Sequence, residues 1–182
     1  MSIVERVCQK IAERLTIRGR VHVINPGGTP YLHRYYIFRR RWIKDRCKNL
    51  LLVSDVANWV SNHLPSCYLH HFHRGDLDKA LHNHPWSFSL SIILTSGYTE
   101  LRWDRSKGRV VTRLVRPGDI NIIRADDYHK VDLVDKENGC WTLFFSGPRI
   151  QNWSFWDPQH PLSAPIPWED YVDGHQLGEL SN

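Results

Sequence analysis

Residues 81–98 read Leu-His-Asn-His-Pro-Trp-Ser-Phe-Ser-Leu-Ser-Ile-Ile-Leu-Thr-Ser-Gly-Tyr, and the fold that we expect for the chain follows from this stretch. Successive side chains of an extended strand alternate between its two faces, so His82 and His84 project to the same side, about 6.5 Å apart. Two imidazoles at this spacing can bind one metal ion, since imidazole suits Zn, Fe, Ni and Cu. A divalent ion needs at least one further ligand, which has to come from another part of the chain.

The best candidate for that ligand is His129, in residues 116–133. Pro117-Gly118-Asp119 indicates a tight turn, and the residues after it alternate as in a strand. His129 shares one face of this strand with Val131 and Leu133, so its imidazole points where the apolar side chains point, into a barrel interior. The predicted metal ligands are His82, His84 and His129.

These two motifs resemble the metal-binding motifs of the cupin superfamily: a histidine pair, a hydrophobic strand and a glycine turn, then Pro-Gly-Asp and a third histidine. The resemblance covers residues 67–145, about the size of one small β-barrel. It implies a mainly β fold, a single cupin barrel (a double-stranded β-helix or jelly roll), with an N-terminal helix and a proline-rich C-terminal tail. The longer runs His-Asn-His-Pro-Trp and Thr-Leu-Phe-Phe-Ser-Gly-Pro-Arg resemble a group of bacterial and phage cupins without an assigned substrate, so the resemblance implies a fold and a metal only.

The chain departs from the cupin pattern at one position. Many cupins carry a glutamate four or five residues after the second histidine, where this chain has Phe88 and Ser89. Glu100 could replace the missing carboxylate. However, the alternation along residues 98–104 favours the odd-numbered side chains as the inward face, which turns Glu100 outward.

The length of 182 residues fits one structural domain, and 41% hydrophobic residues are enough for one core. Within it we expect an N-terminal helical arm in residues 1–30, the cupin barrel in residues 31–150 and a C-terminal wrapping tail in residues 151–182. Apolar residues at three- and four-residue spacing predict an amphipathic helix in the arm, with Ser2 as its N-cap. Four prolines in the tail oppose regular structure there.

The charge and the cysteines restrict the possible partners only weakly. A net charge of +5, from 24 basic and 19 acidic residues, gives slight support to an anionic ligand or nucleic acid. The four cysteines form no Cys-x-x-Cys pair, so they suggest neither a zinc ribbon nor a redox motif. No stretch approaches the roughly 20 apolar residues of a membrane span, and the N-terminus lacks a leader pattern, so we expect a cytoplasmic protein.

Several further side chains are expected to contact substrate or to support the histidines. His71 and His73 form a second His-x-His pair, which suggests a second metal site or, with more weight, groups that contact substrate. Serines at 87, 89 and 91 share one strand face and would form a polar wall beside the metal. An aspartate at 76, 78 or 127 could orient an imidazole through its second nitrogen, and an arginine at 102, 113 or 124 could hold an anionic substrate. The substrate-contacting or supporting candidates are His71, His73, Ser87, Ser89, Asp76, Glu100 and Arg102.

Three function classes are compatible with these residues. The first is a mononuclear Fe(II) three-histidine oxygenase or dioxygenase acting on a small molecule, with Zn, Ni or Mn as alternative metals. The second is a cupin isomerase or epimerase acting on a sugar or nucleotide, with His71 or His73 as the base. The third is a non-catalytic nucleotide or nucleic-acid binding module that uses the aromatic, arginine-rich strand of residues 31–42. Cupin barrels commonly pair, so we also expect a homodimer.

Overall fold

The computed structural model describes residues 1–25, 30–39, 42, 55, 59, 63–76, 80–160 and 163–171. In this part of the chain the strands form two six-stranded antiparallel sheets. Sheet A has the order β1-β2-β3-β10-β5-β8, and sheet B has the order β12-β11-β4-β9-β6-β7. The elements are α1 (Ile3–Ile17), β1 (Val21–Ile24), β2 (Leu32–Phe38), β3 (Ser66–Phe72), β4 (Leu81–His82), β5 (Phe88–Ile93), β6 (Tyr98–Asp104), β7 (Arg109–Val115), β8 (Ile120–Arg124), β9 (His129–Leu133), β10 (Cys140–Ser146), β11 (Ser154–Trp156) and β12 (Ile166–Pro167).

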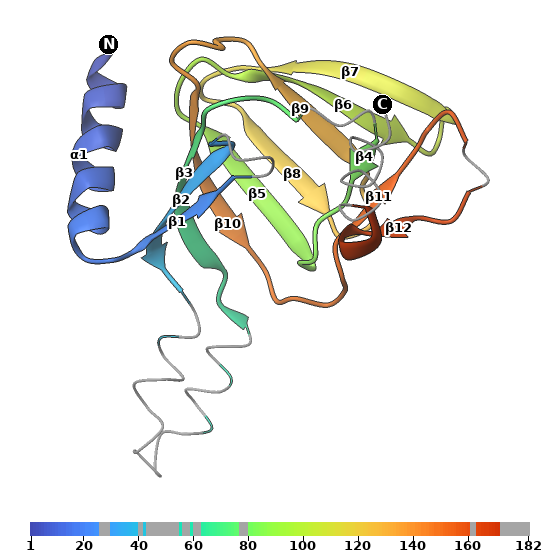
Figure 1. Cartoon of the computed structure of the whole chain (residues 1–182), viewed down its shortest axis with the longest axis horizontal. Helices are drawn as coiled ribbons and strands as arrows, with labels where there is room; N and C mark the ends of the chain where they lie inside the picture. The colour runs from blue at the N-terminus through green and yellow to red at the C-terminus, as the bar shows by residue number, and fades with distance from the viewer. Residues whose placement is uncertain are drawn as a thin grey trace, which may run out of the picture.

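The chain passes repeatedly from one sheet to the other between β3 and β10, as in a jelly roll (Figure 1). Strand β5 therefore pairs with β8 and β10, which follow much later in the sequence, and β9 pairs with β4 and β6. This strand order confirms the mainly β, jelly-roll fold. Its functional consequence is that residues far apart in sequence meet between the two sheets.

Helix α1 packs on the outer face of sheet A (Figure 1). Ser2 caps it as expected, because its hydroxyl accepts a hydrogen bond from the Glu5 backbone N–H and the Glu5 carboxylate bonds back to Ser2. Cys8, Ala12 and Leu15 are buried against the sheet. The predicted apolar face is wider than the buried one, since other apolar side chains of the helix remain exposed: Ile3, Val4, Val7 and Ile11.

A second apolar cluster lies between the sheets. Its members come from β5, β6, β7, β9 and β10, and several are almost inaccessible to solvent: Ile93, Tyr98, Val115, Val131, Leu133 and Cys140. Burial of this kind contributes on the order of 25 cal/mol per Å² of apolar surface, so this cluster holds the two sheets together.

The segment after the barrel adds two short strands to sheet B. Strand β11 pairs with β4, with Phe155 opposite His82, and β12 pairs with β11. The prolines therefore do not exclude regular structure throughout this segment. Pro167 lies in β12 at the edge of the sheet, where a missing N–H is tolerated.

The predicted strand over residues 31–42 is β2, which ends at Phe38. It does not present all its arginines on one exposed basic face, because Arg34 interacts with buried His70 between the sheets. Parts of other predictions lie outside the described residues: residues 26–29 of the arm, residues 40 and 41 of the arginine-rich strand, Cys47, Asp78, and residues 161–162 and 172–182 of the tail. Among the described helices, none is both long and apolar enough to cross a membrane.

Candidate metal centre

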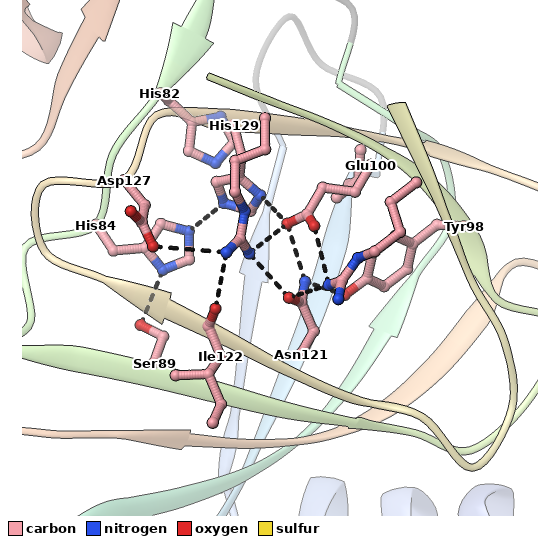
Figure 2. Close-up of polar contacts among 12 residues, drawn as sticks. His82, His84, Ser89, Tyr98, Glu100, Asn121, Ile122, Asp127 and His129 are labelled. Atoms are coloured by element: carbon pink, nitrogen blue, oxygen red, sulfur yellow. Dashed lines mark hydrogen bonds and ion pairs between the residues drawn. The ribbon is translucent and has the colours of Figure 1, made fainter. Parts of the chain in front are cut away.

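Three histidines come together between the sheets, two from neighbouring strands and one from the chain just after the first of these strands (Figure 2). His82 ends β4, His129 begins β9, and the two residues are direct partners in the antiparallel pairing of these strands. His84 follows two residues after His82 and returns to the same side of the chain. One nitrogen of each ring lies within 4.8 Å of the others. The structure thus unites the three predicted ligands.

The spacing of two of these rings already suits a metal. The Nε2 atoms of His84 and His129 are 3.0 Å apart. Two nitrogen ligands at a right angle around an ion, with bonds of about 2.1 Å, would be separated by about 3.0 Å. His82 lies beside both rings, with centroid distances of 5.5 Å to His84 and 4.8 Å to His129. The donor set therefore fits a divalent transition metal.

Burial keeps the imidazoles of His82 and His84 neutral, and the neutral imidazole is the form that binds metal. Loss of hydration lowers the pKa of His82 to about 4, with the nearby carboxylate of Asp76 partly opposing the shift. Desolvation, together with the neighbouring rings, lowers the pKa of His84 well below its usual value. A neutral imidazole has a free lone pair, so His82 and His84 do not need to lose a proton at neutral pH before binding a cation.

The second nitrogen of each histidine faces a polar partner, and Figure 2 shows the contacts of His84 and His129. The Nδ1 of His129 lies 2.9 Å from Oε1 of Glu100, and the Nδ1 of His84 lies 3.0 Å from Oγ of Ser89. The Nδ1 of His82 is 3.9 Å from Oδ2 of Asp76. Such partners orient metal-binding imidazoles and leave Nε2 for the ion. Because the Ser89 hydroxyl can either donate or accept, it can support both tautomers of His84.

Glu100 points inward, so the predicted face of residues 98–104 is wrong. Glu100 is only 1% exposed and Tyr98 is 3% exposed, whereas Thr99 and Leu101 are half-buried. The interior is polar here, so the rule that apolar side chains mark the inward face fails. Burial alone would raise the pKa of Glu100, but the hydrogen bond to His129 and the charge of Arg102 hold it well below the usual range.

Two arginines and an asparagine complete the surroundings of this carboxylate. Arg102 donates to Oε1 of Glu100 at 2.9 Å and to Asn121 at 2.8 Å, and Arg113 lies 3.1 Å from Oε2. The amide of Asn121, which is fully buried, also donates to Glu100 at 2.9 Å. Arg102 therefore serves as a partner of Glu100, and its contact with a substrate stays a prediction. Asn121 was not among the predicted residues, although its alternation with Ile120 and Ile122 places it on a separate strand face.

Aromatic side chains surround the histidines on the remaining sides. The rings of Trp86 and Phe144 lie 5.7 Å and 6.1 Å from His84. Trp153 and Phe155 lie 5.8 Å and 6.0 Å from His82. An apolar surround lowers the local dielectric and so strengthens every charge interaction of a bound cation.

Asp76 has partners besides His82, and the remaining predicted residues have partners of other kinds. Asp76 accepts hydrogen bonds from the Tyr31 hydroxyl at 2.6 Å and the Val131 backbone at 2.7 Å, so it ties β9 to the chain before β2. Ser87 pairs through its backbone N–H with Pro148. His71 stacks on Trp141 on the outer face of sheet A, away from the three histidines.

His73 belongs to the same outer group, with its ring 4.3 Å from those of His71 and His33. An apolar groove beside this group runs between α1 and sheet A. Among the described residues, only the trio of His82, His84 and His129 has metal-ligand spacing. The structure therefore brings neither His71 nor His73 to the candidate metal centre.

Comparisons with known proteins add structural neighbours but no family. No family model and no curated protein matches the chain. A solved structure of Fe(II)-HppE with the alternative substrate (S)-1-HPP is similar over 69% of this chain, at 8% identity and a TM-score of 0.46, and this chain spans 54% of its length.

Two other solved structures have comparable similarity. KdgF from Halomonas sp. matches over 71% of this chain and 88% of its own, at 11% identity and a TM-score of 0.42. A point mutant of oxalate decarboxylase OxdC from Bacillus subtilis matches over 84% of this chain and 34% of its own, at 13% identity and a TM-score of 0.45. What this chain binds has to be inferred from its own residues.

Proposed function

We propose that this protein is a mononuclear metalloenzyme in which His82, His84 and His129 bind Fe(II), and that it oxidises a small molecule with dioxygen. The observation that carries the proposal is the convergence of three imidazole nitrogens within 4.8 Å, on buried or half-buried rings. Three neutral ligands leave a divalent ion its full charge and open coordination positions. The bound metal would supply Lewis-acid and one-electron chemistry.

The protein's own groups tune and protect this centre. The ionised Glu100 carboxylate accepts a hydrogen bond from the Nδ1 proton of His129. This contact makes Nε2 of His129 more basic and so a stronger ligand for the metal. Ser89 fixes the plane of the His84 ring. The aromatic rings of Trp86 and Phe144 limit the access of water to His84. Together these contacts favour tight binding of one ion in a fixed orientation.

The test is the metal content of purified protein, measured by inductively coupled plasma mass spectrometry. Wild type is expected to hold close to one equivalent of transition metal, and His82→Ala, His84→Ala and His129→Ala are each expected to lose it while circular dichroism stays unchanged. His71→Ala, on the outer face of sheet A, is the control and should keep the metal. Equal metal content in wild type and the three ligand variants would contradict the proposed centre.

The reaction is tested separately on iron-loaded protein with an oxygen electrode. Small thiols, diketones and aromatic compounds serve as the substrate panel. Oxygen uptake that needs iron and disappears in His129→Ala would support the oxygenase. Turnover of a sugar or nucleotide by chelator-treated protein would instead support the isomerase alternative.

We also propose that the protein is a homodimer that uses the outer face of sheet A. Strand register places two apolar rows across β10, β5 and β8. The rows are Phe145-Leu90-Ile122 and Leu143-Ile92-Ile120. Ile120 and Ile122 are each 56% exposed, and neither row carries a charge. Two copies can therefore meet along these rows without burying a charge from them, in the isologous contact typical of dimers.

Sedimentation tests this assembly. Wild type should sediment at twice the chain mass of 21.4 kDa, and Ile122→Lys should shift it toward the single-chain mass. Leu114→Lys on sheet B, where Leu114 is 43% exposed, is the matched control and should leave the dimer intact. Wild type at the single-chain mass, or an Ile122→Lys dimer, would contradict the proposal.

A further inference from the structure

Arg34 places a positive charge among buried side chains between the sheets. It lies on β2 in register with His70 of β3, which lies in register with Thr142 of β10. These three residues form one row across sheet A on the face opposite α1. His70 is 1% exposed and Thr142 is fully buried, so the row belongs to the barrel interior.

The contacts of Arg34 leave its charge without a counterion. Its Nε donates to Nε2 of His70 at 3.0 Å, and its Cζ lies 5.3 Å from the ring centre of Tyr68 and 5.5 Å from that of Trp86. None of these partners is an acid. Arg34 is half-buried, and in the part of the chain that the structure describes it forms no ion pair and donates to no acceptor besides Nε2 of His70. Desolvation lowers the pKa of Arg34, as expected for a cation withdrawn from water.

The two neighbours of Arg34 in the row offer further unused hydrogen-bonding groups. Because an arginine Nε can only donate, Nε2 of His70 is the acceptor, and the proton of the neutral ring is on Nδ1. This Nδ1 and the Oγ1 of Thr142 are buried without a hydrogen-bond partner among the described residues. Native proteins pair nearly all such buried groups. The unpaired donors of His70 and Thr142, in one row with an arginine that has no counterion, therefore point to an anionic ligand.

This row adjoins the candidate metal centre. The Trp86 ring that contacts Arg34 lies 5.7 Å from the ring of His84. The Phe144 ring lies 4.6 Å from His70 and 6.1 Å from His84. One aromatic side chain therefore separates the guanidinium of Arg34 from the imidazole of His84. A small molecule can span the distance between these two groups.

We propose that Arg34 binds an oxyanion group of the substrate, a carboxylate or a phosphoryl group, while another part of the same molecule binds the metal. The inference rests on the proposed metal centre. A guanidinium presents two parallel N–H donors that match two oxygens of either group, and it remains charged at neutral pH. The ion pair would also compensate a cation that the fold leaves without a partner.

The test is calorimetric titration of cobalt-loaded protein with oxalate, phosphonoacetate and imidazole. Imidazole is a neutral ligand that reports on the open metal position alone. Arg34→Gln is expected to weaken both oxyanions by at least about 30-fold, as for loss of one partner of a buried charge pair, and to leave imidazole affinity and metal content unchanged. Arg109→Gln, at an exposed position on β7, is the control for charge and should bind like wild type. Oxalate offers only carboxylates, whereas phosphonoacetate offers a carboxylate and a phosphonate. A loss in Arg34→Gln that is larger for phosphonoacetate than for oxalate identifies the phosphoryl group as the preferred ligand of Arg34, and an equal or smaller loss identifies the carboxylate.

The outcomes separate this inference from the metal centre. Metal-loaded Arg34→Gln that binds both oxyanions like wild type would overturn the role of Arg34 and leave the centre intact, and so would a wild type that binds neither. If wild type holds no metal, the proposed centre is wrong. The oxyanion site is then tested by titrating metal-free wild type and metal-free Arg34→Gln with the same two oxyanions and comparing their affinities. If Arg34→Gln does not fold, Arg34→Lys decides, since it keeps the charge but loses the paired donors. Unchanged oxyanion affinity in Arg34→Lys would then refute the contact.

Discussion

The carboxylate of Glu100 lies 2.9 Å from Nδ1 of His129, although 29 residues separate them in the sequence. The two residues belong to neighbouring strands of sheet B, β6 and β9. Arg102 and Arg113 bind the same carboxylate, so Glu100 links a predicted metal ligand to a charged network that extends away from the metal (Figure 2). A side chain that contributes no ligand atom therefore orients one histidine of the candidate metal centre.

Glu100→Gln should weaken metal binding by about 10- to 100-fold, because the uncharged amide supports the His129 imidazole less well. It should also lower the free energy of unfolding, since two arginines lose their shared counterion. Metal titration with a competing chelator and urea unfolding measure the two effects. Glu137→Gln, an exposed carboxylate on a turn, is the control. Unchanged metal affinity in Glu100→Gln would refute the supporting role.

Ser89→Ala should reduce metal affinity while leaving the fold stable, because it removes the partner of the His84 Nδ1 and only one buried oxygen. The expected loss is again about 10-fold or more. Ser91→Ala removes a buried hydroxyl from the same face of β5 and should keep wild-type affinity. Equal losses in both variants would show that packing on this strand, and no specific hydrogen bond, controls the metal.

Acid should destabilise the protein through the outer histidine group. Desolvation, with repulsion from His71 and His33, lowers the pKa of His73 to about 4 from an ordinary value of 6.5. The unfolded chain therefore binds a proton that the folded chain does not, and stability falls as the pH falls from 6.5 toward 4. Urea unfolding at pH 7 and pH 5 should show a smaller loss in His73→Gln than in wild type. His22→Gln, on the exposed face of β1, should behave like wild type, and an equal loss in His73→Gln would reject this account.

Gly97→Ala should cost more stability than Gly108→Ala. Both glycines have positive φ, 87° and 59°, where any other residue is strained by about 1–2 kcal/mol. A methyl group at Gly97 would also collide with the backbone oxygen of Val115, whereas nothing lies within 4 Å of the corresponding position at Gly108. Thermal unfolding of both variants measures the difference. Equal losses would show that the backbone near Val115 yields to the added methyl group.

The metal ligands were accessible to sequence reasoning because local spacing and strand alternation carry the information. His82 and His84 are two residues apart, so an extended backbone places them on one side whatever the rest of the fold does. The apolar residues on the same strand face as the third ligand, Val131 and Leu133, indicate that His129 faces inward. The resemblance to cupin motifs then relates the two segments, and β4 and β9 indeed pair at His82 and His129.

Local sequence patterns were thus enough to predict the capped N-terminal helix and the three histidines, and the jelly-roll fold was predicted from the resemblance to cupin motifs. Contacts between distant segments were needed to show that Glu100 faces the barrel interior, that Arg34 lies beside His70, and that His71 lies beneath α1. Alternation along a strand shows which side chains share a face, but it does not show which face is inward when the interior is polar. That choice depends on partners from distant strands, because a buried charge is stable only where another chain segment supplies its counterion or hydrogen bonds.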